Sequence, residues 1–399
     1  MKFSDLDKSE KLLKKREDLP DSKKEIKEDV SNTLNSSIPL IDKKENKIQE
    51  LPSKPPETAS FSNKMDEGIK PIDNDKIEFD EVILREKSHY TYSNLISIVS
   101  RDFRKISEGL YYNISDDFFY ASQLILDEVR GNGYFANFLK YLTPANYLYS
   151  HALNLAIITC GIMNELKYSD DEIKKAIVSA LFIDIGMLNY RLLTSVEREF
   201  TDIERETIKN HLKDGINIAS KVFSYDEEMK KFVCQAINLS HERYDGSGYF
   251  KLSGDEIQEV YQIISISDFY EALTHKRSYR EAFDEHEVLS GFIGKTRRLF
   301  HHRAIKGLIS FLTLYPCGSF VKLSSGEVGR VLFINKSKPL KPIVRIEMDA
   351  NFREIGKRVI NLADSPLLYI EGYISLKELS NKNPGFVKRE KIKWLWIEW

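Results

Sequence analysis

The chain between about residues 80 and 312 follows a helical pattern of apolar positions. Residues 91–106, 116–129 and 150–166 carry apolar side chains at spacings of three and four, which is the period of one helix face. Ser169 and the two acids that follow it are typical of a helix N-terminus. The pattern therefore predicts a mainly α domain at residues 79–314.

The pattern changes after Tyr315 and Pro316. Residues 318–335 alternate between apolar and polar side chains, and Ser325-Gly326 inside this stretch is typical of a hairpin turn. Two later segments, 342–349 and 369–376, also resemble strands. We therefore expect a small β-rich domain at residues 315–399. Its last six residues, 394–399, alternate like an edge strand and also form a possible docking patch.

Residues 1–78 have a different composition from the rest. They are rich in Lys, Glu, Asp, Ser and Asn and contain very few aromatic side chains. Such a segment cannot bury enough apolar surface to offset the entropy of ordering it. We expect a charged, disordered N-terminal tail, with a short helix near residues 8–16 or a tethering role as alternatives.

The overall composition narrows the classes of function. The net charge is −2 and no block of the chain is strongly basic, which argues against a general nucleic-acid-binding protein. The three cysteines follow no CxxC spacing, which favours a reduced, cytoplasmic compartment. No apolar run approaches the roughly 20 residues that span a bilayer, so we expect no membrane span.

One carboxylate, Asp184, lies on the apolar face of a predicted helix. Ile177, Leu181 and Leu188 share that face. A buried carboxylate is costly unless something compensates its charge. The same reasoning places four other side chains on apolar faces: His151, His211, His241 and Asp268.

A single histidine in this position is more often a core residue with its hydrogen bonds satisfied than a ligand. Three histidines and two acids from several helices instead predict a metal site inside a helical bundle. His89, His275 and His286 are expected at the surface, and His301-His302 is a weak second candidate for a ligand pair.

Five motifs occur in one colinear series between residues 90 and 315. They read YLYSHALNLA, FIDIGML, HLKDGINIA, SHERYDGSGY and ISDFYEALTHKRSYR. This series resembles the HD-GYP family of cyclic di-GMP phosphodiesterases. The resemblance implies an HD-type metal-dependent phosphohydrolase bundle in bacterial second-messenger signalling, and the β-rich segment looks like the extension found in many family members.

The resemblance also implies roles for single residues. His151, Asp184 and Asp268 would hold one divalent metal, and Asp184, His211 and His241 a second, with iron or manganese expected. Asp184 would bridge them and be the central catalytic residue. The chain departs from the family motifs at four positions: a His of the family is Ile183, its phosphate-binding Lys is Met187, another His is Ser240, and its Pro is Phe250. Each metal would keep three protein ligands and lose one.

The substrate side is implied by two further segments. Asp245, Gly248 and Tyr249 form a loop for a guanine base or a protein partner, and Arg277 and Arg280 would pair with phosphates. Solvated surface arginines are the alternative. Two functions stay open: a cyclic di-GMP phosphodiesterase of reduced activity that yields pGpG or GMP, and a catalytically silent cyclic di-GMP sensor or protein-interaction module. A phosphohydrolase acting on another nucleotide is a third.

Overall fold

A computed structural model describes residues 74–131, 135–140, 147–194, 198–275, 280 and 282–394. All described residues belong to the unit Ser62–Trp399. Most of the expected N-terminal tail, residues 1–73, lies outside the described residues. The first described helix, α3 (Asn74–Ser107), begins a few residues before the expected end of that tail at 78.

The fold from α3 to α13 is helical, as predicted. The long helices are α3, α4 (Ile114–Gly131), α5 (Tyr147–Glu165), α6 (Asp170–Phe182), α9 (His211–Val222), α10 (Glu227–Leu239), α11 (Glu259–Thr274) and α13 (His302–Leu312). The short ones are η2 (Phe135–Lys140), η4 (Ile185–Tyr190), α7 (Arg191–Thr194), α8 (Asp202–Ile208), η5 (Gly254–Glu256), α12 (Glu285–Ile293) and η6 (Arg297–Leu299).

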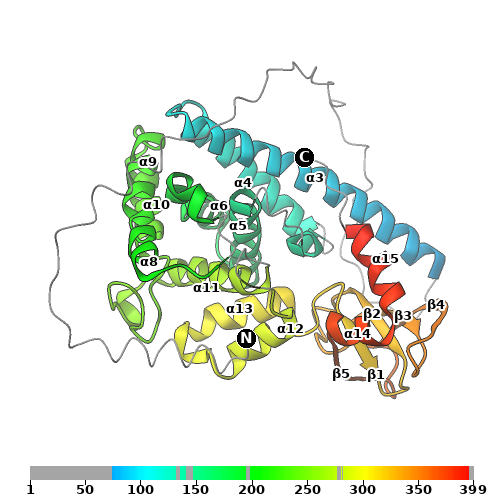
Figure 1. The fold of residues 1–399 in the computed structure, drawn as a ribbon. Coiled ribbons are helices and arrows are strands. Elements are labelled where there is room, and N and C mark those ends of the chain that lie inside the picture. The colour runs from blue at the N-terminus through cyan, green and yellow to red at the C-terminus, as the bar shows by residue number, and fades with distance from the viewer. Residues whose placement is uncertain are drawn as a thin grey trace, which may run out of the picture. The chain divides into compact units, whose positions relative to one another are not determined.

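Helix α5 is the centre of the core. It is buried from Ser150 to Met163 and packs against α3, α4, α6, α11 and α13 (Figure 1). A helix that is apolar on all sides is stable only when other elements surround it. Aromatic rings of Phe118, Phe182 and Phe223 extend this core through edge-to-face contacts at 5.3 and 5.1 Å.

Helix α6 carries the chain into the region of Asp184. It begins with a capping box, in which the Ser169 hydroxyl accepts from the Glu172 amide and the Glu172 carboxylate accepts from the Ser169 amide. It ends at Ile183, and η4 follows. Gly186 in η4 lies against α9: a Cβ at this position would be 2.0 Å from the His211 carbonyl oxygen. This close approach fixes the chain around Asp184 against the start of α9.

The C-terminal domain contains a five-stranded antiparallel sheet in the order β4-β3-β2-β1-β5. The strands are β1 (Phe320–Leu323), β2 (Val328–Phe333), β3 (Ile343–Met348), β4 (Glu354–Asn361) and β5 (Ile370–Ile374). Gly326 takes the positive φ of +86° that the β1–β2 turn requires. The small β-rich domain is thus confirmed. Strand β4 has no counterpart in the sequence prediction.

Two helices, α14 (Leu376–Lys382) and α15 (Pro384–Trp394), follow the sheet. Leu379, Phe386 and Val387 pack with β-strand residues such as Phe320 and Met348 in one hydrophobic cluster. The expectation of an edge strand from Trp394 onward is wrong for Trp394, because this residue ends α15. The remaining five residues, 395–399, lie outside the described residues.

One described stretch, Asp170–Leu193, is long and apolar enough to cross a membrane by those two criteria alone. In the structure it comprises α6, η4 and α7, and 61% of its apolar window is buried in the protein core. Core helices commonly have this property, so the stretch is weak evidence for a span. All three cysteines, Cys160, Cys234 and Cys317, are free thiols.

Candidate metal centre

The five side chains singled out from the sequence come together at one place. His151 lies on α5, Asp184 lies between α6 and η4, and His211 is the first residue of α9. His241 follows the C-terminus of α10, and Asp268 lies on α11. They form two groups that could hold a metal ion, His151 with Asp184 and Asp268, and Asp184 with His211 and His241. Within each group the ligand atoms lie within 4.8 Å of one another.

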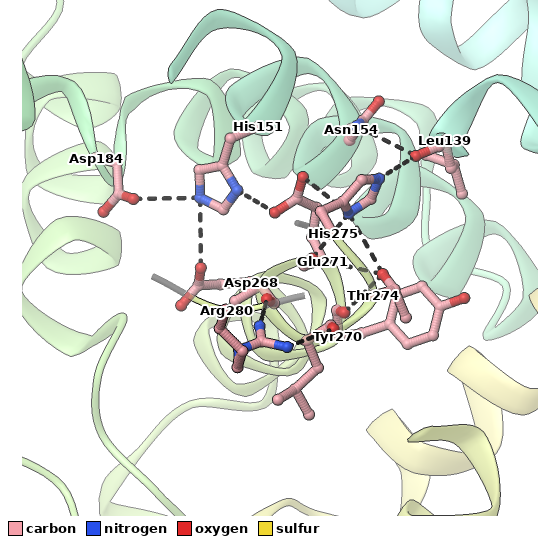
Figure 2. A network of polar contacts seen from close by, with 12 residues as sticks. Leu139, His151, Asn154, Asp184, Asp268, Tyr270, Glu271, Thr274, His275 and Arg280 are labelled. Atoms are coloured by element: carbon pink, nitrogen blue, oxygen red, sulfur yellow. Dashed lines mark hydrogen bonds and ion pairs between the residues drawn. The ribbon is translucent and has the colours of Figure 1, made fainter. Parts of the chain in front are cut away.

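The first group, which we call the His151 half, is deep in the bundle (Figure 2). His151 Nε2 lies 3.2 Å from Asp184 Oδ2 and 3.4 Å from Asp268 Oδ1. This nitrogen is buried and has no hydrogen bond of acceptable geometry. The other ring nitrogen, Nδ1, bonds to the Glu271 carboxylate. A histidine whose Nδ1–H points to a carboxylate presents the Nε2 lone pair for a metal.

In the second group, which we call the His241 half, a main-chain carbonyl orients the first histidine. His211 Nδ1 donates to the Ile208 carbonyl at 2.6 Å, which leaves Nε2 bare in the neutral ring. That Nε2 lies 3.3 Å from His241 Nε2 and 3.6 Å from Asp184 Oδ1. These two ring nitrogens and the carboxylate lie within 4.8 Å of one another and can hold a cation between them. The donor set of both halves therefore fits a divalent cation with nitrogen and oxygen ligands.

The pKa shifts in the cluster also indicate a site for a cation. Burial acts to raise the pKa of Asp184, but His151, His211 and His241 outweigh it and hold this pKa far below its usual value. Burial acts to lower the pKa of His151, but Glu271, Asp184 and Asp268 raise it well above its usual value. The pKa of His241 is lowered by burial. The carboxylates thus attract a cation strongly, and a metal would take the place of the His151 proton.

The departures Ile183 and Ser240 place no ligand in the centre. Ile183 caps the C-terminus of α6 and is 1% exposed, packed in the main hydrophobic core. The buried Ser240 hydroxyl donates to the Ile237 carbonyl at 2.9 Å and so bonds back to its own helix. Met187, at the position where the resemblance implies a lysine, lies in η4 and carries no charge. Three protein side chains remain for each metal position.

A loop after His241 covers the His241 half. The Tyr249 ring lies 4.8 Å from the His241 ring, and Lys209 Nζ lies 5.5 Å from the centre of the Tyr249 ring. The buried Glu242 carboxylate holds this loop by accepting from the Phe250 amide at 2.8 Å and the Leu252 amide at 2.9 Å. Gly248 packs directly on Glu242, where a Cβ would be 2.6 Å from its Cα. Phe250 is 52% exposed.

The remaining residues of the expected substrate side have structural partners. Asp245 accepts from the Ser247 amide and hydroxyl and lies 3.4 Å from Arg298 Nε. Arg280 donates to the carbonyls of Ala272 at 2.6 Å and Leu273 at 3.2 Å, at the end of α11. These bonds give Arg280 a helix-capping role, and phosphate binding by Arg280 stays a prediction. Arg277 lies outside the described residues.

Sequence reasoning missed Glu271 and misplaced His275. Glu271 is fully buried, and His275, expected at the surface, is only 6% exposed. Glu271 follows Asp268 by three residues and so lies on the same helix face, a signal that was available. His286 is also half-buried, stacked between the rings of Tyr315 and Tyr373 at 5.2 and 5.0 Å. His89 is exposed, as predicted.

Two segments of the chain match known domain families. Residues 147–292 match the model of the HD domain, and residues 320–382 match that of the KOW domain associated with the HD domain. Together with the curated relatives described next, these matches support the resemblance to the HD-GYP family. The mainly α fold with a small β-rich C-terminal domain is the one expected for it.

The relatives share low identity with the chain. Cyclic di-GMP phosphodiesterase PA4108 of Pseudomonas aeruginosa is 23% identical over 56% of this chain and 54% of its own length. Cyclic di-GMP phosphodiesterase PdeB of Borreliella burgdorferi is 26% identical over 52% of this chain and 55% of its own. The 3'3'-cGAMP-specific phosphodiesterase 1 of Vibrio cholerae is 26% identical over 46% of this chain and 42% of its own.

The chain thus spans about half the length of the curated relatives that it matches. A solved structure of Bd1817, an HDG"Y"P protein from Bdellovibrio bacteriovorus, aligns with a TM-score of 0.46 and 12% identity over 56% of this chain and 71% of that chain.

Proposed function

We propose that the protein is a cyclic di-GMP phosphodiesterase of reduced activity that acts in the cytoplasm and yields pGpG or GMP. The observation that carries this proposal is the convergence of His151, His211, His241 and Asp268 on one shared carboxylate, Asp184. A shared carboxylate between two ligand groups is the arrangement that a pair of metals a few ångströms apart requires. Three ligands in each group leave coordination positions for water and substrate.

The metals are expected to be iron or manganese, one or two ions per chain. When bound, they would supply Lewis-acid activation of the phosphate and a nucleophilic water at neutral pH. The chain's own residues would hold them: Glu271 orients His151, and the Ile208 carbonyl orients His211. Asp184 belongs to both groups and lies 3.2 Å from His151 Nε2 through Oδ2 and 3.6 Å from His211 Nε2 through Oδ1.

A cyclic dinucleotide fits the surroundings of the centre. Tyr249 is 46% exposed beside His241 and offers a ring face on which a guanine base can stack. The ammonium group of Lys209 lies next to that ring and complements a phosphate. The curated relatives act on cyclic di-GMP and on 3'3'-cGAMP, two members of one substrate class. We place cyclic di-GMP first.

Reduced activity follows from the residues at 183, 187 and 240. The absence of one positively charged donor at the reacting phosphate commonly lowers the rate about 10²- to 10³-fold, and Met187 supplies no such donor. Ile183 and Ser240 leave each metal position with one side chain fewer, which weakens metal binding. The site therefore supports slow turnover.

A silent sensor is the second candidate, and one observation favours it. Ile183 is packed in the core and the Ser240 hydroxyl bonds to its own helix, so both positions have a structural role without metal. In that case the loop of Gly248 and Tyr249 would bind cyclic di-GMP, or a protein partner, without hydrolysis.

The experiment combines metal analysis with turnover. The purified full chain is loaded anaerobically with Fe²⁺ or Mn²⁺, its metal content is measured by mass spectrometry, and products from cyclic di-GMP and 3'3'-cGAMP are separated by chromatography. Slow formation of pGpG or GMP supports the phosphodiesterase. Calorimetric binding of cyclic di-GMP with no product supports the sensor. Metal-loaded protein that neither binds nor cleaves either nucleotide at high micromolar concentration would overturn both candidates.

A further inference from the structure

A second histidine, His275, lies behind the His151 half. It directly follows α11, and its side chain is almost completely buried beside Glu271 (Figure 2). Glu271 is buried on the same helix and faces a histidine on either side. Its Oε2 bonds to His151 Nδ1, and its Oε1 lies 3.2 Å from His275 Nδ1. His151, Glu271 and His275 therefore form a line of three ionisable groups that leads from the centre into the core.

The hydrogen bonds of His275 define its protonation. Its Nδ1 lies 2.8 Å from the Glu271 main-chain carbonyl, and its Nε2 bonds to the Leu139 carbonyl. A carbonyl oxygen can only accept a hydrogen bond, so each ring nitrogen has to donate one. Either neutral form of the ring would leave one nitrogen lone pair facing an oxygen lone pair. The hydroxyl of Thr274, 3.4 Å from Nδ1, is too distant to remove that conflict.

The charges explain why a cation is needed at this position. A fully buried carboxylate is strongly unfavourable unless a positive charge compensates it. A histidine that ligates a metal is neutral, so His151 cannot supply that charge in the metal-bound protein. His275 lies in contact with Glu271 and can supply that charge, whereas the Asn154 amide, which also bonds to Glu271, is neutral.

We propose that His275 is a buried imidazolium that balances the Glu271 carboxylate and, through Glu271, orients His151 with its Nε2 lone pair toward Asp184 and Asp268. His275 is thus a positioning residue for the His151 half alone, because the contacts of His211 and His241 run to the Ile208 carbonyl and the Tyr249 ring. The inference rests on the proposed function only in that it takes this centre to bind metal.

The first test reads the protonation directly. The full chain, without metal, is labelled with ¹⁵N-histidine, and the signals of His275 are assigned by their loss in His275→Gln. We expect two protonated ring nitrogens with slowly exchanging protons, because the Glu271 and Leu139 carbonyls each need a donor whether or not metal is bound. A signal from a bare ring nitrogen on His275 overturns the proposal, whatever the metal binding of the protein.

The second test measures the effect on metal binding in one half at a time. In a His241→Ala background, which isolates the His151 half, His275→Gln should raise the dissociation constant for Mn²⁺ about 10- to 100-fold, the usual effect of removing a group behind a metal ligand. In a His151→Ala background, which isolates the other half, the same change should have no effect.

Tyr92→Phe serves as the matched control in both backgrounds. It removes a buried hydroxyl that donates to Asn154 at 2.9 Å, and Asn154 bonds to the same Leu139 carbonyl as His275, without changing any charge. We expect it to leave the Mn²⁺ constant unchanged. An unchanged constant for His275→Gln in the His241→Ala background overturns the proposal. Equal weakening by Tyr92→Phe also overturns it, since the effect would then be structural loosening.

A failure of the proposed function can be distinguished from a failure of the inference about His275. If the parent chain bound no Mn²⁺ or Fe²⁺ at all, the metal-dependent activity would be refuted, and the ¹⁵N signals of His275 would by themselves decide the present inference. If His275→Gln does not fold, the signals of the parent chain still decide it, because their protonation pattern can be compared with that of other assigned histidines.

Discussion

The two halves of the candidate centre share Asp184 but are supported in different ways. Behind His151 stand side chains, the Glu271 carboxylate and the His275 ring, at the fully buried interface of α5 and α11. Behind His211 stands a main-chain carbonyl, that of Ile208, and over His241 lies the half-exposed ring of Tyr249. The first half thus depends on charged groups that a substitution can remove, while the second depends on backbone geometry and on a loop that Glu242 holds.

The two positions at which the resemblance implies a further ligand also differ. Ile183, beside the His151 half, is a large side chain that fills the core. Ser240, beside the His241 half, is small, buried and bonded to its own helix. A histidine at 183 would replace apolar packing with a polar ring, whereas a histidine at 240 would need additional volume. The two losses are therefore not equivalent in their structural consequences.

The largest expected effect comes from the residue that the halves share. Asp184→Ala should remove both metals at once, because each group loses its common carboxylate. Mass spectrometry of the reconstituted variant measures this directly. Asp214→Asn is the control, since that carboxylate accepts from Asn189 at 3.1 Å and Tyr190 at 2.9 Å nearby without belonging to either group. Full metal content in Asp184→Ala would show that the shared-ligand assignment is wrong.

Repair of both halves should have the next largest effect. The triple variant Ile183→His, Met187→Lys, Ser240→His is expected to turn over cyclic di-GMP on the order of 10²-fold faster than the parent, since it restores both ligands and a phosphate partner. Either histidine alone should achieve little, because the chemistry needs both ions.

Rates are compared in metal-loaded proteins whose folding has been checked by thermal melts. A folded, metal-loaded triple variant without any gain would mean that the substrate side has also been lost. A parent that already matches the triple variant would mean that water or other side chains complete the centre.

The free energy of unfolding, measured without and with metal, should show whether Ile183→His and Ser240→His each gain a metal ligand or only destabilise the fold. Without metal, Ile183→His is expected to lower the free energy of unfolding by about 1–3 kcal/mol, since it buries a ring with unsatisfied polar atoms. Ser240→His should cost a similar ~1–3 kcal/mol through overpacking. Mn²⁺ at one fixed concentration should then stabilise each variant more than it stabilises the parent, by about 1.4 kcal/mol for each tenfold gain in affinity. Urea unfolding gives these values, and a variant that Mn²⁺ stabilises no more than the parent has not gained a ligand.

The smallest effect is expected at Tyr249, whose ring lies beside His241. Tyr249→Phe keeps the ring over His241 and should leave cyclic di-GMP affinity almost unchanged, while Tyr249→Leu should weaken it by about 1–3 kcal/mol, the contribution of stacking one base. Metal content should be the same in both variants. Calorimetry at fixed salt distinguishes them, and equal affinities for Phe and Leu would argue against stacking on this ring.

Local sequence patterns predicted the helices and the five clustered side chains for one physical reason. A polar group on the apolar face of an amphipathic helix needs a partner, and the spacing reveals that face. The pattern missed strand β4 because its burial follows no alternation along Glu354–Asn361. It misplaced His275 because the Leu139 carbonyl that holds its ring is 136 residues away in the chain. The capping bonds of Arg280 depend likewise on where the chain returns after α11.

The contact between Gly186 and α9 has a consequence for how much sequence change the centre tolerates. Gly186 has no functional group, but any side chain there would displace the His211 carbonyl and the Gly215 amide, which lie 2.0 and 2.7 Å from the Cβ position. The displacement would separate Asp184 from His211. In a saturation library screened for metal-loaded protein, position 186 should therefore accept as few alternatives as the ligands themselves, while Met187, the next residue, should accept many.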